Sequence, residues 1–584
     1  FDLRWSRLSF INRFRPSGYF EFGTGLTANP LNPAGTGFGL ATFLLGEVSG
    51  GNMGYRPFFQ YRSLPLGVYV QDDWKVTRNL TLNVGLRYDV SFGPTEIHDR
   101  FSNFDPFVVN PETGLLGALV YAGVDRPRSF VNLDSNNVGP RFGFAWNPGG
   151  DGKTAIRGGY GLIYTIAEIG HTQGDNSNAL GFSVDTPFAP AAANERAFRF
   201  SDGPGVILQP LGAAGGPSAF RGLSVRYQDR SAPTPYVQHW NFTIQRSLWG
   251  GWVVSAIYAG SKGTKLFGGN YDLNQLDPAH YSLGLALQDN VPNPFYGQIA
   301  TGPLAAANVQ RSQLLRPYPD YQTVQTFAAN NASSIFHSFQ FIAEKRFSRG
   351  LSALISYTNS KLISDAHSLG GGGGPSSSLE GFRLGRFNRR LDRRVDIDDV
   401  SQRLVVSSVY ELPVGRGRLL LTNANALVNG ILGGWQVNGI GTFQTGVPLV
   451  VRGSNNFTGI AFPDVIGDPS LPSDQRSQNG WFNTSVFRNP ANFTIGNAPF
   501  TLPSTRAPGL VDVSFSLFKT FSFLERYRLE ARWEMFNALN TVNLNAPNTT
   551  FQPNVQGVNV NANFGRIFGA GEARRMQFGL RLTF

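Results

Sequence analysis

The clearest pattern in the chain is a strict alternation of apolar and polar residues within positions 66–90. In its second half the apolar set is Leu80, Leu82, Val84, Leu86, Tyr88 and Val90, and the polar set is Thr81, Asn83, Gly85, Arg87 and Asp89. Because successive side chains of a β-strand point to opposite faces, this period of two predicts a strand with one apolar and one polar face. With the run before it and a turn at 77–79, the segment predicts a long antiparallel hairpin.

Alternation of the same kind recurs along the rest of the chain. It covers residues 139–147, 153–165, 237–248, 252–260, 334–347, 351–361, 401–412, 435–446, 511–521, 527–535 and 576–584. Alternation and turn signals together predict about sixteen strands. Residues 1–65 contain strand-like pieces that are hard to delimit, and residues 166–235 show no sustained period.

The connections between these strands alternate in length. Those near residues 78, 150, 250, 349, 415 and 523 are mostly short, whereas the intervening ones mostly run for tens of residues. Tilted strands of about nine to eleven residues cross a bilayer, and outer-membrane barrels have short periplasmic turns and long extracellular loops. The pattern therefore predicts an all-β fold, a large antiparallel transmembrane β-barrel of the Gram-negative outer membrane. A soluble β-sandwich would explain one such strand but not six hairpins.

Composition agrees with a barrel and excludes other classes. The chain has 69 glycines and 48 phenylalanines among 584 residues, and only 15% of its residues are charged. No run of 18 apolar residues is present, so a helical membrane protein is not indicated. The net charge of +11 comes from residues spread along the chain rather than from a compact basic arm, which argues against a nucleic-acid partner. It favours anionic ligands or lipopolysaccharide only weakly.

Charged residues in the strand at 527–535 fix which face points inward. Arg528, Glu530, Arg532 and Glu534 alternate with apolar residues. One arginine on the lipid face near the midplane costs about 2–4 kcal/mol, so two would cost roughly 4–8 kcal/mol. We therefore expect this row to face the lumen. The polar faces of the other strands add four lumen-facing candidates, namely Arg87, Asp89, Arg141 and Arg157. The alternative for each of these residues is that it only contributes to a solvated barrel wall and has no further role.

The chain ends on an alternating strand with a terminal aromatic residue. Gln577, Gly579, Leu582 and Phe584 resemble the C-terminal signal by which outer-membrane barrels are delivered to the barrel-assembly machinery. A terminal phenylalanine alone would not be specific, but it agrees with the hairpin pattern. We therefore expect the barrel-assembly machinery to be a partner.

Several stretches resemble TonB-dependent receptors. GVYVQDDWKVTRNLTLNVGLRYDV (67–90) carries the most specific resemblance, and NVGPRFGFAWNPGGDGKTAIRGGYGLIY (137–164), VYELPVGRG (409–417) and LGGWQVNGIGTFQTGVPL (432–449) are similar to the Oar-like branch. The resemblance implies a 22-stranded barrel, a separate plug domain and coupling to the TonB complex. We accordingly expect residues 1–584 to be an N-terminally truncated barrel domain without plug, TonB box or signal segment. Its surroundings would be outer-membrane lipid and lipopolysaccharide.

The resemblance further implies import of an extracellular substrate, which the residues do not identify. Recognition is expected in the long loops at 166–235, 263–333 and 447–509, because loops on a rigid scaffold usually carry binding residues. Peptides, glycans and metal chelates all remain open. The competing hypothesis is an adhesive or structural surface barrel, or a passive pore, without energised transport.

No motif indicates an enzyme, a cofactor or a metal site. The HExxH and GxSxG motifs are absent, and the six histidines are scattered. Asp396, Asp398 and Asp399, beside Asp392, could offer oxygen ligands to Ca²⁺, but arginines interleave with them and the loop spacing is missing. The expectation for this group is a solvated salt-bridge cluster near the mouth of a strand.

Overall fold

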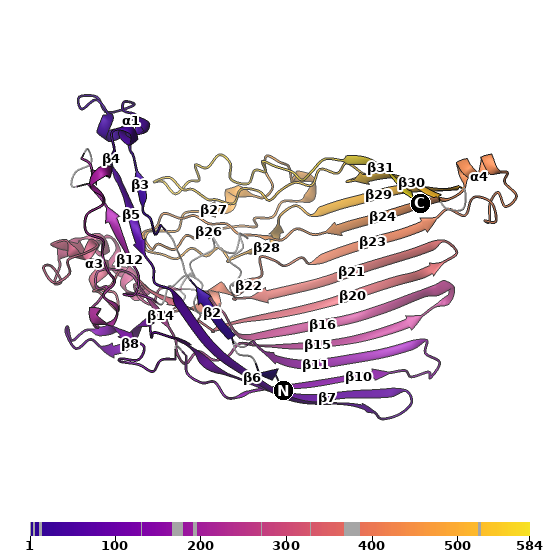
Figure 1. Cartoon of the computed structure of the whole chain (residues 1–584), viewed down its shortest axis with the longest axis horizontal. Coiled ribbons are helices and arrows are strands. Elements are labelled where there is room, and N and C mark those ends of the chain that lie inside the picture. Colours follow the sequence, from indigo (N-terminus) through magenta and orange to yellow (C-terminus); the bar gives the residue numbers. More distant parts are fainter. Residues whose placement is uncertain are drawn as a thin grey trace.

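A computed structural model describes residues 2–3, 6–10, 15–129, 131–165, 179–190, 195–269, 271–327, 329–366, 386–523 and 527–584. One antiparallel sheet of sixteen strands dominates it (Figure 1). Its strands are β1 (Asp2–Leu3), β2 (Ser6–Phe10), β6 (Phe59–Lys75), β7 (Leu80–Glu96), β10 (Asn137–Trp146), β11 (Thr154–Tyr164), β15 (Tyr236–Ser247), β16 (Trp252–Leu266), β20 (Ala332–Ser348), β21 (Leu351–Ser364), β22 (Arg394–Val395), β23 (Gln402–Glu411), β24 (Trp435–Gln444), β29 (Leu510–Phe523), β30 (Tyr527–Phe536) and β31 (Arg575–Thr583). The antiparallel sheet of about sixteen strands expected from alternation is confirmed.

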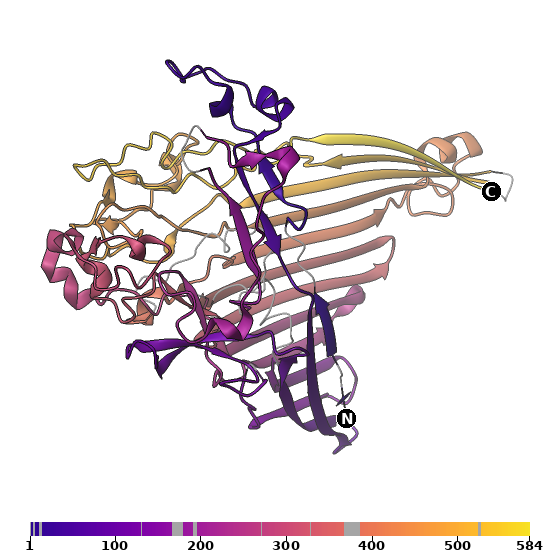
Figure 2. The same ribbon diagram turned by 60° about the vertical axis from the view of Figure 1, so that its left-hand side comes forward.

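The long strands follow one another in chain order across the sheet. The path runs β6-β7-β10-β11-β15-β16-β20-β21-β23-β24-β29-β30-β31, and β1 and β2 pair with β6. The sheet curves from indigo β6 to yellow β31 (Figure 2). In the described part of the chain, β31 pairs only with β30, and β1 and β2 pair only with β6, so this path has two open ends.

The register joins the apolar faces of neighbouring strands into one continuous row. Val84 of β7 lies opposite Phe142 of β10, which lies opposite Tyr160 of β11. At the other end of the sheet Trp533 lies opposite Phe578, and their rings stack. Val84 and Phe142 are about half exposed, at 51% and 48%. The apolar row is therefore an outer surface of the sheet rather than half of a protein core.

Short and long connections lie at opposite ends of the strands (Figure 1). The turns on one side are 76–79, 147–153, 248–251 and 349–350. The connection between β23 and β24 is an exception, because the turn expected at 413–417 continues to residue 434 and includes the helix α4 (Ala426–Leu432). The described parts of the long loops lie on the other side and belong to the connections 97–136, 165–235, 267–331, 365–401, 445–509 and 537–574.

The polypeptide outside the large sheet contains small elements that alternation does not reveal. The further strands are β3 (Tyr19–Glu21), β4 (Glu47–Val48), β5 (Gly50–Tyr55), β8 (Ser102–Val109), β9 (Leu116–Tyr121), β12 (Val184–Phe188), β13 (Phe198–Arg199), β14 (Val225–Gln228), β17 (Asn290–Pro292), β18 (Asn308–Gln310), β19 (Val324–Phe327), β25 (Pro448–Leu449), β26 (Asp464–Val465), β27 (Phe487–Arg488) and β28 (Leu502–Arg506). The further helices are α1 (Gly39–Leu44) and α3 (Arg311–Leu314), with 3-10 turns at 24–27, 200–202, 212–215, 249–251, 278–288, 303–305, 389–392, 473–475 and 484–486. No helix among the described residues is long and apolar enough to cross a membrane.

The buried hydrophobic clusters lie mainly in the loops. One cluster joins loop 445–509 to loop 537–574 through Phe482, Phe487, Phe551 and Phe564. A second joins the loops at 97–136, 165–235 and 267–331, with the rings of Phe104, Tyr121 and Tyr321 at its centre. The parallel pair β14 and β19 also links two loops that are distant in the chain. The long loops therefore form a packed layer at one end of the strands.

Candidate functional site

The eight residues expected to face the lumen share one face of the large sheet. Arg87 lies opposite Gly139, Arg157 opposite Thr243, and Arg532 opposite Gly579, always on the face turned away from the apolar row. The remaining members, namely Asp89, Arg141, Arg528, Glu530 and Glu534, follow from the same register. Their role in the lumen stays a prediction.

These residues form local pairs and do not converge on one centre. Arg87 and Asp89 make an ion pair of 2.8 Å on β7. The guanidinium of Arg157 donates to Gln245 at 3.1 Å. On β30, Glu530 pairs with Arg532. The row is a polar wall with ion pairs on β7 and β30, whereas Arg157 on β11 contacts a neutral amide.

The four residues of the predicted assembly signal divide between the two faces. Gln577 donates to Glu534, and Gly579 lies opposite Arg532, both on the polar face. Leu582 lies opposite Leu529 in the apolar row, and Phe584 is exposed beyond the end of β31. Their part in delivery to the assembly machinery stays a prediction.

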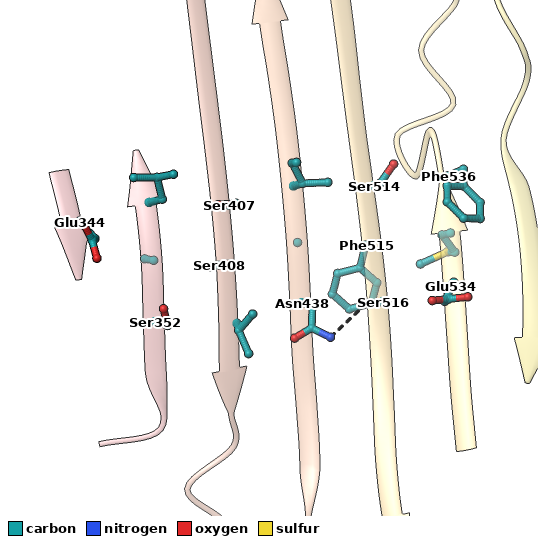
Figure 3. Close-up of a pocket in the computed structure, with 16 residues that line it drawn as sticks. Glu344, Ser352, Ser407, Ser408, Asn438, Ser514, Phe515, Ser516, Glu534 and Phe536 are labelled. Atoms are coloured by element: carbon teal, nitrogen blue, oxygen red, sulfur yellow. Dashed lines mark hydrogen bonds between the residues drawn. The ribbon is translucent and has the colours of Figure 1, made fainter. Parts of the chain in front are cut away.

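The polar wall contains a hollow of about 460 Å³ across β20 to β30 (Figure 3). Glu344 and Glu534 lie at its two sides. Between them are small hydroxyl and amide side chains, including Ser352, Ser407 and Asn438, and Asn438 donates to Ser516 at 3.3 Å. Of these residues, the sequence indicates only Glu534. Alternation predicts the face of each serine, but only the register gathers serines from strands that lie far apart in the chain.

A larger cleft of about 650 Å³ lies in the loop layer, between residues 271–325 of one long loop and 452–493 of another. Aromatic rings, glutamine amides, two arginines and one carboxylate line it. Two of the three loops expected to carry recognition therefore meet at one cavity. Of the third loop, residues 166–178 and 191–194 lie outside the described residues.

Asp272 is the carboxylate of this cleft. Its Oδ1 accepts hydrogen bonds from the backbone N–H groups of Asn274 and Val324, each at 2.8 Å. Burial raises the pKa of Asp272, although these two bonds and the charge of Arg316 act in the opposite direction. Across the described residues, no protein donor reaches Oδ2. Two backbone hydrogen bonds thus fix Oδ1 of Asp272 in the wall of the cleft.

The opposite wall of the cleft is aromatic and cationic. The guanidinium of Arg452 lies 3.8 Å from the ring centroid of Phe462 and 4.3 Å from that of Phe500. Phe457 and Phe493 stack with their centroids 5.6 Å apart. A guanidinium stacked on rings keeps its orientation, and exposed ring faces bind flat apolar groups. The cleft can therefore hold a small ligand by stacking and hydrogen bonding.

The acidic group at 392–399 differs from its expectation. A solvated salt-bridge cluster is expected, but Asp392 and Asp399 are buried, and Asp399 is only 2% exposed. Arg506 of another loop pairs with Asp399 at 2.6 Å, and the guanidinium of Arg394 stacks 4.1 Å from the ring centroid of Phe500. The predicted salt bridges are therefore present. The prediction that the cluster is solvated is wrong, because a loop that is distant in the sequence folds over it. Throughout the described ranges, no group of three or more acidic or histidine side chains is placed to hold a metal ion. His171, His367 and the glycine run at 370–374 lie outside those ranges.

The residues of the loop cleft are not found by sequence reasoning. Asp272, Arg452 and Phe457 lie in stretches without period or motif, so nothing distinguishes them from other loop residues. The only usable signal is short apolar runs bounded by glycine, such as Gly459–Phe462, which predict buried pieces of a loop rather than a binding site.

A family model for the outer membrane beta barrel domain matches residues 1–577. No curated protein matches the chain. Among solved structures, the chain is similar to the ferripyoverdine receptor of Pseudomonas aeruginosa (10% identity, TM-score 0.38, covering 91% of this chain and 40% of that one). It is also similar to the outer membrane transporter YddB from Escherichia coli (10%, 0.40, 90% and 55%) and to BauA, the ferric preacinetobactin receptor from Acinetobacter baumannii (8%, 0.36, 91% and 44%). The chain spans about half the length of these structures or less.

Proposed function

The chain belongs to the outer membrane beta barrel domain family, and from this premise we propose that it is the barrel of a TonB-dependent transporter. The protein lies in the outer membrane, with its apolar row toward lipid. In the proposal, a ligand is captured in the loop layer and enters through the barrel with energy supplied by TonB. The sequence resemblance to TonB-dependent receptors, and to their Oar-like branch, supports this assignment.

The observation that carries the proposal is the cleft between the loops at 267–331 and 445–509. Its volume of about 650 Å³ lies within the roughly 300–1,000 Å³ typical of small-molecule sites. A cleft with an anchored carboxylate, a stacked guanidinium and the exposed ring of Phe457 fits capture of a discrete ligand. An adhesive surface needs no such cavity.

The polar wall has a second part in the proposal. The family resemblance implies a plug domain upstream of these residues, which would carry the TonB contact. The matched pairs on the wall, such as Arg87 with Asp89 and Glu530 with Arg532, would hold that plug by polar contacts. The serine-lined hollow beside Glu534 would leave room between plug and wall.

The test uses the full-length protein in the outer membrane of a Gram-negative host with or without TonB. Cells receive three fluorescent probes separately: a mixture of short peptides, a mixture of oligosaccharides and a ferric chelate. We expect one probe to accumulate inside the cells only when TonB and the proton gradient are intact. Accumulation independent of TonB would indicate a pore, and surface retention without uptake would indicate an adhesin.

A variant of the cleft links transport to this site. Phe457→Ala removes an exposed ring from the cleft and should lower binding of the transported probe. Phe107→Ala, at an exposed loop ring outside the cleft, is the matched control. Site-specific cross-linking of the full-length protein to TonB reports on coupling even when none of the probes is transported.

A further inference from the structure

The connection between β23 and β24 carries an unusual exposed apolar surface. It occupies residues 412–434 on the side of the short turns and includes α4 (Figure 1). Its exposed apolar side chains are Leu419, Leu420, Leu421, Leu427, Ile431 and Leu432. Hairpin turns that face water are normally polar, so this surface needs a partner.

Two side chains of the apolar row fasten this connection to the outer wall of the sheet. The indole of Trp435 donates to the carbonyl of Ile431 at 2.9 Å. The ammonium of Lys519, which lies opposite Ala531 in the apolar row, donates to the carbonyls of Gly433 and Ile431. The carboxyl end of α4 is therefore attached on the lipid side of the wall and not on the polar side.

The level of this attachment along the strands is marked by tryptophans. Trp74, Trp146, Trp252 and Trp435 all belong to the apolar row. The first three each lie within a few residues of a short turn, and Trp435 begins β24 at the same end of the strands. Rows of aromatic side chains mark the membrane–water interface of outer-membrane barrels, and short turns mark the periplasmic side. Trp435, and with it α4, therefore lies at the periplasmic interface.

The charges of the segment suit phospholipid headgroups. Residues 412–434 contain Arg416 and Arg418 and no acidic residue. Arg418 pairs with Glu411 at the end of β23, but its side chain is still half exposed. An apolar surface with arginines at its margin is the pattern of segments that lie in a membrane interface.

We propose that residues 412–434 are an interfacial anchor whose partner is the periplasmic phospholipid leaflet of the outer membrane. The leucines at 419–421 and the exposed side chains of α4 insert among the acyl chains. Arg416 and Arg418 contact the headgroup phosphates. The anchor continues the lipid-facing apolar row beyond the ends of β23 and β24, and it does not depend on the proposed transport function.

The test exploits the absence of cysteine from the chain. Leu420→Cys and Leu427→Cys are each labelled with a nitroxide in the full chain, reconstituted into vesicles of phosphatidylethanolamine and phosphatidylglycerol. Asn79→Cys in the turn at 76–79 is the water-exposed control, and Phe142→Cys in the apolar row is the lipid-exposed control. A gel-mobility assay of folded and heated samples confirms that each variant forms the sheet.

Collision with oxygen and with a water-soluble nickel chelate gives the readout. Labels at 420 and 427 should collide with the nickel chelate several-fold less than the label at 79, and with oxygen about as often as the label at 142. Nickel collisions equal to those at 79 would overturn the proposal. Dipolar broadening between labels of two molecules would also overturn it, because the surface would then bind a second copy. Two independent label positions keep the test valid if one variant fails to fold.

Discussion

The strands of the large sheet and the loops at their ends differ in where their apolar side chains lie. In the strands the apolar row remains on the surface, as the half-exposed Val84 and Phe142 show. In the loops, Phe104, Phe482 and Phe551 are almost fully buried among other loop residues. The loops thus fold as a soluble protein does, whereas the strands leave their apolar face for the membrane to cover.

This difference in burial reflects the solvent around each region, which is lipid for the strands and water for the loops. Lipid covers the apolar row, so the strands need no second layer of protein, and their backbone groups are satisfied by neighbouring strands. The loops stand in water and must bury their own apolar surface, which joins segments that are distant in the chain. Packing of this kind also holds the walls of the loop cleft in place.

The largest expected effect comes from removing a ring from a loop core. Phe482→Ala should cost about 3–5 kcal/mol of local loop stability, because Phe482 is only 2% exposed and packs against Phe487 and Phe564. Limited proteolysis should then cut the loops at 445–509 and 537–574 faster, while the gel mobility of the folded sheet stays unchanged. Loss of the folded sheet as well would show that the two regions are not independent.

A charge placed on the apolar row tests the strands of the large sheet instead of the loops. Phe341→Arg, at a residue of β20 that is 40% exposed, should destabilise the protein by about 2–4 kcal/mol in lipid. The neighbouring Gln340→Arg is the matched control, since Gln340 lies on the polar face and should tolerate the charge. Urea unfolding in vesicles measures both. Equal losses in the two variants would contradict the assignment of the faces.

The pH dependence of the loop layer should change with Asp272. Because burial raises the pKa of Asp272 in the folded protein, its ionised form weakens the loops at neutral pH. That cost decreases as the pH falls through the raised folded pKa and is gone below the ordinary pKa of the unfolded chain, so stability from this group increases toward acid. Asp272→Asn should therefore stabilise the loops at neutral pH and lose this advantage in acid. Hydrogen exchange of residues 271–274 at several pH values measures the difference in loop stability between the variant and the unchanged protein. If the variant became relatively more stable in acid, the raised pKa of Asp272 would be refuted.

The smallest effect is expected on the polar wall. Glu530→Gln removes one partner of the pair with Arg532, whose side chains are 26% and 35% exposed. Partly exposed pairs of this kind contribute about 0–1 kcal/mol, so the sheet should unfold at nearly the same urea concentration. A clear loss of TonB-dependent uptake without loss of stability would indicate that the pair acts on the plug rather than on the wall.

The sequence alone determined the long strands from residue 66 onward, which of their residues share a face, and that the long loops lie at one end of the strands. Alternation at 80–90 and 527–535 is local, because the pleat of a strand imposes a period of two whatever lies beside it. An arginine row such as Arg528 and Arg532 is costly in lipid, so the face on which it lies follows from the sequence and the cost of charge in a bilayer. The sheet of about sixteen strands followed from the same reasoning.

Only the tertiary structure decided where the loops meet. The short strands β8 and β9 lie between residues 90 and 139, where no alternating segment is predicted, because two-residue periodicity is lost when both faces of a strand are buried. The expectation of a solvated cluster around Asp399 was wrong because Arg506 covers it from more than a hundred residues away. Asp272 and Arg452 likewise face one cleft through long-range packing, which is set by the shapes of whole loops and leaves no local pattern in the sequence.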